Sequence, residues 1–275
     1  MLITQRTGNI QHSIVLLPVT DEKLLIHQLP DKDIHTIFSS DLFPFFQKNA
    51  VPITSRLSSG HETLRFLQVA VDNMNSSSVC RIQPGLPIDM LPLDILQHAI
   101  AGYGSNYLAA QKTELRRLYV LFHRLMHHEG KRHFLLLSAS ELHRFAETGQ
   151  LSPHISNLSA LSVRERIVVL EHLMEQMETN PNMDIRFSHE ESIFQVCSIF
   201  CINSGCMMIY PNGLSFQGTQ NDEQHPFCAS EINDTELCAD FNHYFINTLI
   251  PVYALRKPEC CTLLRAELMY LRSKL

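Results

Sequence analysis

The sequence predicts an α/β fold made of two tandem, internally duplicated halves. Each half has the order strand, helix, helix, strand, strand, helix, and an amphipathic helix lies at the C-terminal end. Strand-like apolar segments alternate with segments whose apolar residues recur every three or four positions. The same order returns after about 100 residues, which indicates an internal repeat. Of the 275 residues, 45% are hydrophobic and 18% are charged, so the chain is able to bury a large core.

The repeat is visible in matching residues, with small insertions between the matched segments. The matched pairs include Ser40 and Ser140, Leu42 and Leu142, Phe45 and Phe145, Glu62 and Glu165, and Met74 and Met177. We therefore divide the chain into an N-terminal strand extension (residues 1–30), a first α/β repeat (31–130), a second α/β repeat (131–250) and a C-terminal helix (251–275).

Each half begins with an apolar strand, at residues 34–38 and 133–137, and continues into a short helix. Ser40 and Ser140 are the predicted N-caps of these helices, because a serine hydroxyl accepts a hydrogen bond from a free backbone amide of the first turn. A longer amphipathic helix follows. In the second half Ser162 and Glu165 have the spacing of a capping box, which predicts where this helix begins.

Two strands and a closing helix complete each half. The predicted strands are 79–83 and 183–187, followed by the apolar runs 95–100 and 196–202; the closing helices are 105–128 and 234–249. The last amphipathic helix begins near Pro258 and carries Arg272 and Lys274 at its end, where positive charge favours the helix dipole.

Composition excludes several classes of protein. The net charge of −6 disfavours sequence-independent binding to nucleic acid phosphates. No apolar run approaches the length of a membrane span, and the N-terminus has no signal-peptide pattern, so we expect a cytoplasmic protein. The eight cysteines include no Cys-x-x-Cys, which favours buried, reduced thiols over disulfides or a metal site.

One candidate metal site lies near the end of the first half. His123 and His127 are one helical turn apart, a spacing at which two imidazoles bind one divalent metal ion. Arg124 stands where a zinc protease would have its catalytic glutamate. The alternative is a solvated helix end, where histidine favours the negative pole of the helix.

Four serines are candidate ligand-binding residues. Ser39 and Ser40, and Ser138 and Ser140, follow the first predicted strand of each half. In α/β sheets, ligands bind beyond the carboxyl ends of the strands, near helix N-termini. The alternative is a pair of ordinary helix caps with acidic residues in the first turn.

The usual catalytic and nucleotide-binding motifs are absent. The chain contains no Walker A sequence and no Gly-x-Ser-x-Gly. The segment Gly102 to Tyr107 has Tyr107 where a dinucleotide fingerprint needs a small residue. The sequence therefore favours a non-catalytic protein and predicts no cofactor.

Residues 133–151 and 161–170 resemble the C-terminal region of bacterial transcriptional regulators that carry a Cro/repressor-type helix-turn-helix at the N-terminus. The resemblance implies a regulatory or sensory domain. Residues 1–30 are predicted as strand, so we expect no direct contact with nucleic acid from this chain.

The leading hypothesis is a non-catalytic regulatory domain that binds a small-molecule effector or a protein partner. We expect a homodimer formed through the helices near 105–128 and 258–275. A metal-dependent hydrolase using His123 and His127 is the alternative, and a purely structural interaction module is a third possibility.

Overall fold

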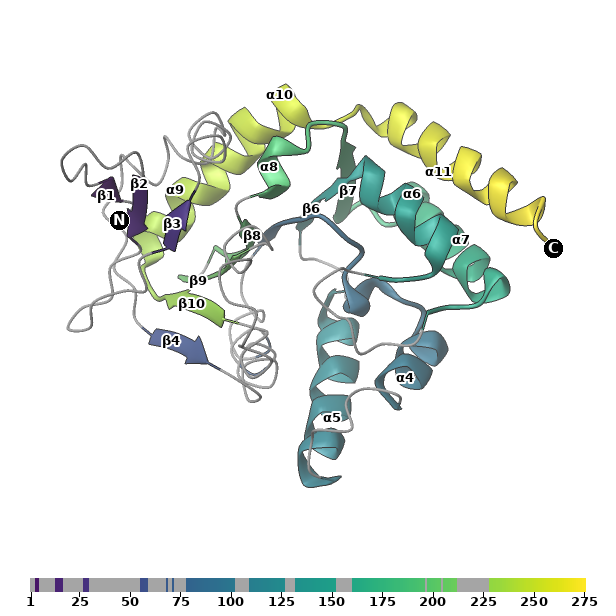
Figure 1. The fold of residues 1–275 in the computed structure, drawn as a ribbon, viewed down its shortest axis with the longest axis horizontal. Coiled ribbons are helices and arrows are strands. Elements are labelled where there is room, and N and C mark those ends of the chain that lie inside the picture. The colour runs from purple at the N-terminus through teal and green to yellow at the C-terminus, as the bar shows by residue number, and fades with distance from the viewer. Residues whose placement is uncertain are drawn as a thin grey trace.

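A mixed seven-stranded sheet organises the computed structural model (Figure 1). The structure describes residues 78–101, 109–126, 132–151, 160–195, 197–203, 205–211 and 228–275, short strands before residue 59, and positions 68 and 71. The strand order is β4-β10-β9-β8-β5-β6-β7. These strands are β4 (Ser55–Ser58), β5 (Val79–Gln83), β6 (His133–Ser138), β7 (Met183–Ser188), β8 (Cys197–Ile202), β9 (Cys206–Pro211) and β10 (Cys228–Ile232). A separate antiparallel sheet contains β1 (Ile3–Thr4), β2 (Ser13–Leu16) and β3 (His27–Leu29).

The sheet has a parallel part and an antiparallel part that meet at β5. Strands β5, β6 and β7 are parallel, with Val79 opposite His133 and His133 opposite Met183. On its other edge β5 pairs antiparallel with β8, which continues through β9, β10 and β4. Helices pack on both faces of β5 and β6, and β6 is accordingly apolar along most of its length, whereas the outer strand β7 carries Asp184 and Arg186 at its less buried positions.

Most of the helices lie in the connections between strands. Two parallel neighbouring strands need a crossover connection, which is usually helical. The crossover from β5 to β6 contains a 3-10 helix (Ile88–Met90), α4 (Leu93–Ala101) and α5 (Ala109–Met126). The crossover from β6 to β7 contains α6 (Ala139–Thr148) and α7 (Val163–Thr179). The remaining helices are α8 (Ser192–Gln195), α9 (Thr235–Tyr244), a π-helix (Phe245–Leu249), α10 (Ile250–Tyr253) and α11 (Lys257–Arg272).

Two apolar clusters form the core, one on each face of the sheet. Successive side chains of a strand point to opposite faces. Accordingly Val79 belongs to the first cluster, with residues of α6, α7 and α11, and Cys80 belongs to the second, with residues of α8 and α9. Figure 1 shows α6, α7 and α11 gathered beside β7. We call the side of the sheet with the Val79 cluster the first face and the side with the Cys80 cluster the second face.

Gly149 ends α6 in the left-handed conformation, with φ 75°. A Cβ added there would lie 2.2 Å from the backbone oxygen of Leu161, so both the dihedral angle and the space require glycine. This close approach fixes the path of the chain from α6 toward α7.

Several sequence predictions are confirmed. The predicted strands 79–83, 133–137 and 183–187 are β5, β6 and β7. The capping box of Ser162 and Glu165 begins α7, and the C-terminal amphipathic helix is α11. The fold is therefore α/β, with helices and a mixed sheet.

Two predictions are wrong. The apolar run 95–100 lies in helix α4, not in a strand, so its predicted counterpart β8 has a different structure. The N-cap of α6 is Ser138 instead of Ser140, because the Ser138 hydroxyl accepts the hydrogen bond from the Glu141 amide. The predicted strand 34–38 and the predicted cap Ser40 lie outside the described residues. The tandem duplication and its domain boundaries stay predictions.

Candidate functional site

The polar residues of interest lie at the carboxyl-terminal edge of the parallel strands. Gln83, Ser138 and Ser188 are the last residues of β5, β6 and β7, and Ser138 is the register partner of Ser188. Both serines are fully buried. The antiparallel half of the sheet lies beside these strand ends, since β5 pairs with β8 along its other side. Ligands of open α/β sheets bind at such an edge.

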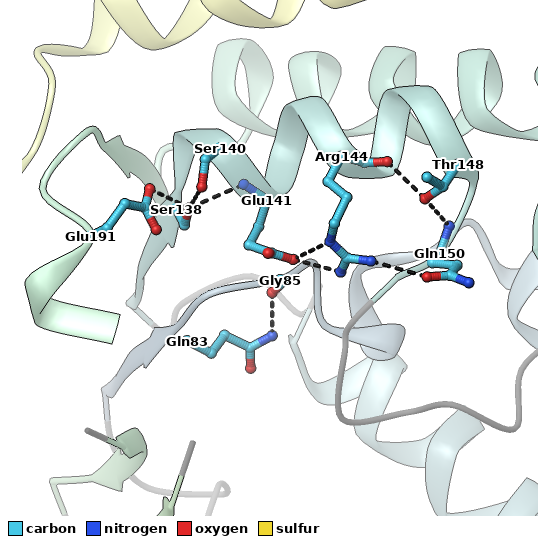
Figure 2. A network of polar contacts seen from close by, with 9 residues as sticks. All are labelled: Gln83, Gly85, Ser138, Ser140, Glu141, Arg144, Thr148, Gln150 and Glu191. Atoms are coloured by element: carbon cyan, nitrogen blue, oxygen red, sulfur yellow. Dashed lines mark hydrogen bonds and ion pairs between the residues drawn. The ribbon is translucent and has the colours of Figure 1, made fainter. Parts of the chain in front are cut away.

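Ser138 is the centre of a hydrogen-bond network at this edge (Figure 2). Its hydroxyl donates to Oε1 of Glu191 over 2.7 Å and accepts from the backbone amide of Glu141 over 3.1 Å. The Ser140 hydroxyl lies 2.9 Å away. A carboxylate only accepts, so the single proton of Ser138 goes to Glu191 and Ser140 is the donor to Ser138. These three contacts use all the hydrogen-bonding capacity of the Ser138 hydroxyl.

The Ser138–Glu191 bond joins two segments that are far apart in sequence. Ser138 ends β6 and caps α6, and Glu191 precedes α8 on the segment that follows β7. The same segment is held locally, since the Glu190 amide donates to the Ser188 hydroxyl over 3.0 Å. The edge is therefore a hydrogen-bonded polar cluster, partly buried, that β6, α6 and the β7–α8 connection share.

A second chain of contacts runs along α6 away from the edge (Figure 2). Arg144 Nε donates to Glu141 Oε2 over 2.7 Å, and its Nη1 donates to Gln150 Oε1 over 3.1 Å. The Thr148 hydroxyl donates to the Arg144 carbonyl over 2.8 Å. Arg144 thus neutralises Glu141, whereas Glu190 and Glu191 have no ion-pair partner within the described ranges. Among the residues that the structure describes, this edge therefore carries more negative than positive charge.

A buried ion pair fixes the loop that leaves β5 at the same edge. Both carboxylate oxygens of Asp89 lie 2.9 Å from Nη1 of Arg81, and the Arg81 guanidinium lies 5.6 Å from the centre of the Phe200 ring. The Asp89 side chain is 1% exposed. We did not predict this pair. The available signal was an arginine inside an apolar strand and an aspartate inside the apolar segment after it, since buried charges require partners.

The predicted site residues are only partly brought together. Ser138 and Ser140 are in contact, and Ser39 and Ser40 lie outside the described residues. His123 lies half-buried on α5, and His127 is outside the described residues. Among the residues that the structure describes, no three histidine, cysteine or acidic side chains are placed to hold a metal ion. The ligand-binding and metal-binding roles of these residues stay predictions.

A histidine that the sequence analysis did not single out lies between α6 and α11. His143 Nδ1 lies 3.0 Å from Oε1 of the buried Glu267, and its Nε2 lies 3.4 Å from Oε1 of Glu147. The hydrogen bond with Glu267 raises the pKa of His143, and the charge of Glu147 adds to that effect. The two carboxylates contact opposite ring nitrogens, so this cluster links helices and is not a chelating site.

Comparisons with known proteins assign no family. No protein-family model and no curated protein sequence matches this chain. No helix in the described part of the chain combines the length and the apolar character needed to cross a membrane. The candidate site therefore depends on its geometry alone.

Proposed function

We propose that the chain is a regulatory α/β module that binds a small polar effector at the carboxyl edge of β5, β6 and β7. The observation that carries this proposal is the Ser138–Glu191 hydrogen bond, which joins the start of α6 to the β7–α8 connection at that edge. An effector that competes for Glu191 shifts one of these segments relative to the other. The resemblance of residues 133–151 and 161–170 to regulatory regions of bacterial transcription regulators agrees with this role.

The effector is neutral or positively charged. Glu190 and Glu191 repel anions, and Arg144 is already bound to Glu141. Ser140 is exposed, and after donating to Ser138 its hydroxyl oxygen still accepts hydrogen bonds. A ligand with an ammonium group and further N–H or O–H donors fits these acceptors. The signal passes to a partner protein, since we expect no direct nucleic acid contact from this chain.

Isothermal titration calorimetry with putrescine as a cationic probe and phosphate as an anionic probe tests the site. We expect binding of putrescine and none of phosphate, with loss of putrescine binding in Glu191→Gln. That variant keeps an acceptor for Ser138 and removes the charge. Glu175→Gln, at an exposed position on α7, is the matched control and binds as the parent does.

Native mass spectrometry of gently purified protein complements the titration. A retained organic adduct that Glu191→Gln loses supports the regulatory module. A protein that carries no adduct and binds neither probe contradicts it. A stoichiometric zinc or iron mass that disappears in the double variant His123→Ala with His127→Ala favours the metal-dependent hydrolase instead.

Self-association through the C-terminal helix is a second proposal. Met269 on α11 is 73% exposed and Leu275 is 72% exposed. On neighbouring α7, Val168 is 43% exposed, and the ion pair between Arg272 and Glu171 holds the two helices together beside it. Met269 and Val168 lie on neighbouring helices, so a second copy of the chain is able to cover both side chains at once. We expect Met269→Lys to shift the mass measured by light scattering from dimer to monomer, and a parent protein that is already monomeric contradicts the proposal.

A further inference from the structure

Three buried cysteines from separate elements meet beneath α9. Cys80 lies on β5, Cys201 on β8 and Cys238 on α9, and all three belong to the apolar cluster of the second face. Cys80 and Cys201 are register partners on antiparallel strands, so their side chains share one face. All three thiols are free and fully buried. Residues 80, 201 and 238 are far apart in sequence, so the fold alone brings the thiols together.

The three thiols have different partners. The Cys80 thiol donates to Oδ1 of Asn242 over 2.8 Å, and Nδ2 of Asn242 donates to the Ser78 hydroxyl over 3.0 Å. The Cys201 thiol donates to the backbone oxygen of Cys238 over 3.6 Å. Cys80 is thus held by an amide side chain, whereas the Cys201 thiol lies against the backbone of Cys238.

The pair is chemically asymmetric. A hydrogen bond from the Cys201 thiol to the Cys238 thiolate lowers the pKa of Cys238, whereas burial and the negative charge of Asp234 oppose this effect. Cys238 also lies in the first turn of α9, where its amide donates to the Asp234 carbonyl over 3.0 Å. The same hydrogen bond and burial raise the pKa of Cys201, and burial raises that of Cys80. A thiol at a helix N-terminus beside a protonated thiol is the arrangement of redox-active cysteine pairs.

We propose that Cys238 and Cys201 form a dithiol that hydrogen peroxide converts to a disulfide between α9 and β8. The Cys238 thiolate attacks one peroxide oxygen, the O–O bond breaks, and the hydroxide that leaves takes up a proton to become water. The Cys201 sulfur then attacks the sulfur of the Cys238 sulfenic acid, and the thiol proton leaves with the hydroxyl group as a second water. Two thiols and one peroxide give one disulfide and two waters.

Access of peroxide to the pair depends on local opening of α9. The outer side of α9 is exposed to solvent at Ala239 and Asp240, directly after Cys238. The π-helix Phe245–Leu249 follows it directly and interrupts the regular hydrogen-bond ladder, which favours local rearrangement. The reaction is accordingly slower than that of an exposed cysteine.

Thiol counting and peptide mapping on the full chain test the proposal. The chain has eight cysteines, so N-ethylmaleimide in denaturant labels eight before peroxide treatment. After treatment of the folded protein we expect two fewer labels and an intact mass lower by about 2 Da. A non-reducing digest is expected to contain the peptides of Cys201 and Cys238 joined to each other. Dithiothreitol restores the original count.

Variants separate this pair from the other thiols. In Cys201→Ser the sulfenic acid has no thiol partner at position 201, so we expect dimedone to label Cys238. Cys261→Ser removes a buried thiol on α11 and is expected to leave the disulfide unchanged. A folded parent that keeps all its thiols while the urea-unfolded chain loses them overturns the proposal, as does a disulfide through Cys80. The mapping of the parent decides the question even where a variant fails to fold.

Discussion

The two faces of the sheet are closed by different means. On the first face, α6 and α7 begin at side-chain caps, α6 ends at a left-handed glycine, and ion pairs such as Arg272–Glu171 and Arg265–Glu178 hold α7 and α11 together in antiparallel orientation. On the second face, α9 also begins at a side-chain cap, Asp234, but it covers thiols and an asparagine and continues into a π-helix. Both faces are mainly apolar. The second face differs in burying free thiols and an asparagine that only the fold brings together. We therefore expect chemical reactivity on the second face and rigidity on the first.

The largest expected effect is on the buried ion pair of the first face. Asp89→Ala leaves the Arg81 guanidinium buried without its carboxylate, which costs about 3–5 kcal/mol of unfolding free energy in urea denaturation. Glu114→Ala breaks an exposed pair with Arg117 that water screens, so we expect a much smaller loss of stability. Equal losses in the two variants would show that burial does not distinguish the pairs.

The second face is tested at Asn242, which bridges Cys80 and Ser78. Asn242→Ala leaves the buried thiol and the Ser78 hydroxyl without this partner, so we expect a loss of about 1–3 kcal/mol in the same denaturation. Asn247→Ala is the control, because its side chain is exposed and only donates to the His243 carbonyl. A control that loses as much stability as Asn242→Ala would mean that helix propensity, not the bridge, is responsible.

The capping box of α7 is a local device, so its effect is smaller. Ser162→Ala removes the acceptor for the Glu165 amide and one donor to the Glu165 carboxylate, at a cost of about 1 kcal/mol. Ser162→Thr keeps a hydroxyl and is expected to retain most of the stability. A threonine variant as unstable as the alanine variant contradicts the capping role.

The smallest expected effect is a pH dependence at the contact between α6 and α11. Glu267 and Glu147 raise the pKa of His143. The aromatic ring of Tyr270 on α11 also lies beside the His143 ring. The stabilisation is therefore complete below the ordinary pKa of histidine and is lost as the pH rises through the raised value. His143 is half-exposed, so His143→Gln costs less than about 1 kcal/mol at pH 5 and less still at pH 8.

The control for this pH dependence is His189→Gln, at an exposed position in the β7–α8 connection. Urea midpoints of the parent and of both variants are compared at the two pH values. An effect of His143→Gln that grows with pH would have the wrong sign and would exclude the charged form as the stabilising species.

Local signals in the sequence were sufficient for the long amphipathic helices and the central strands. The apolar spacing and the Ser162–Glu165 box predict α7 because both act within one helix. Short apolar runs are ambiguous between strand and helix. The run 95–100 is helical in the structure, where it forms part of the crossover that the parallel pairing of β5 with β6 requires. The residues of the run do not themselves show which strands will pair.

For the candidate site, the sequence alone determined that serines follow β6 and that acidic residues stand nearby. Which serine caps α6 was decided by the fold, because Ser138 is the residue whose hydroxyl reaches both the Glu141 amide and the Glu191 carboxylate. The ion pair of Arg81 and Asp89 and the thiol pair of Cys201 and Cys238 are likewise products of tertiary structure. Helix caps and apolar periodicity act over a few residues, whereas contacts between distant segments exist only once the sheet order is set.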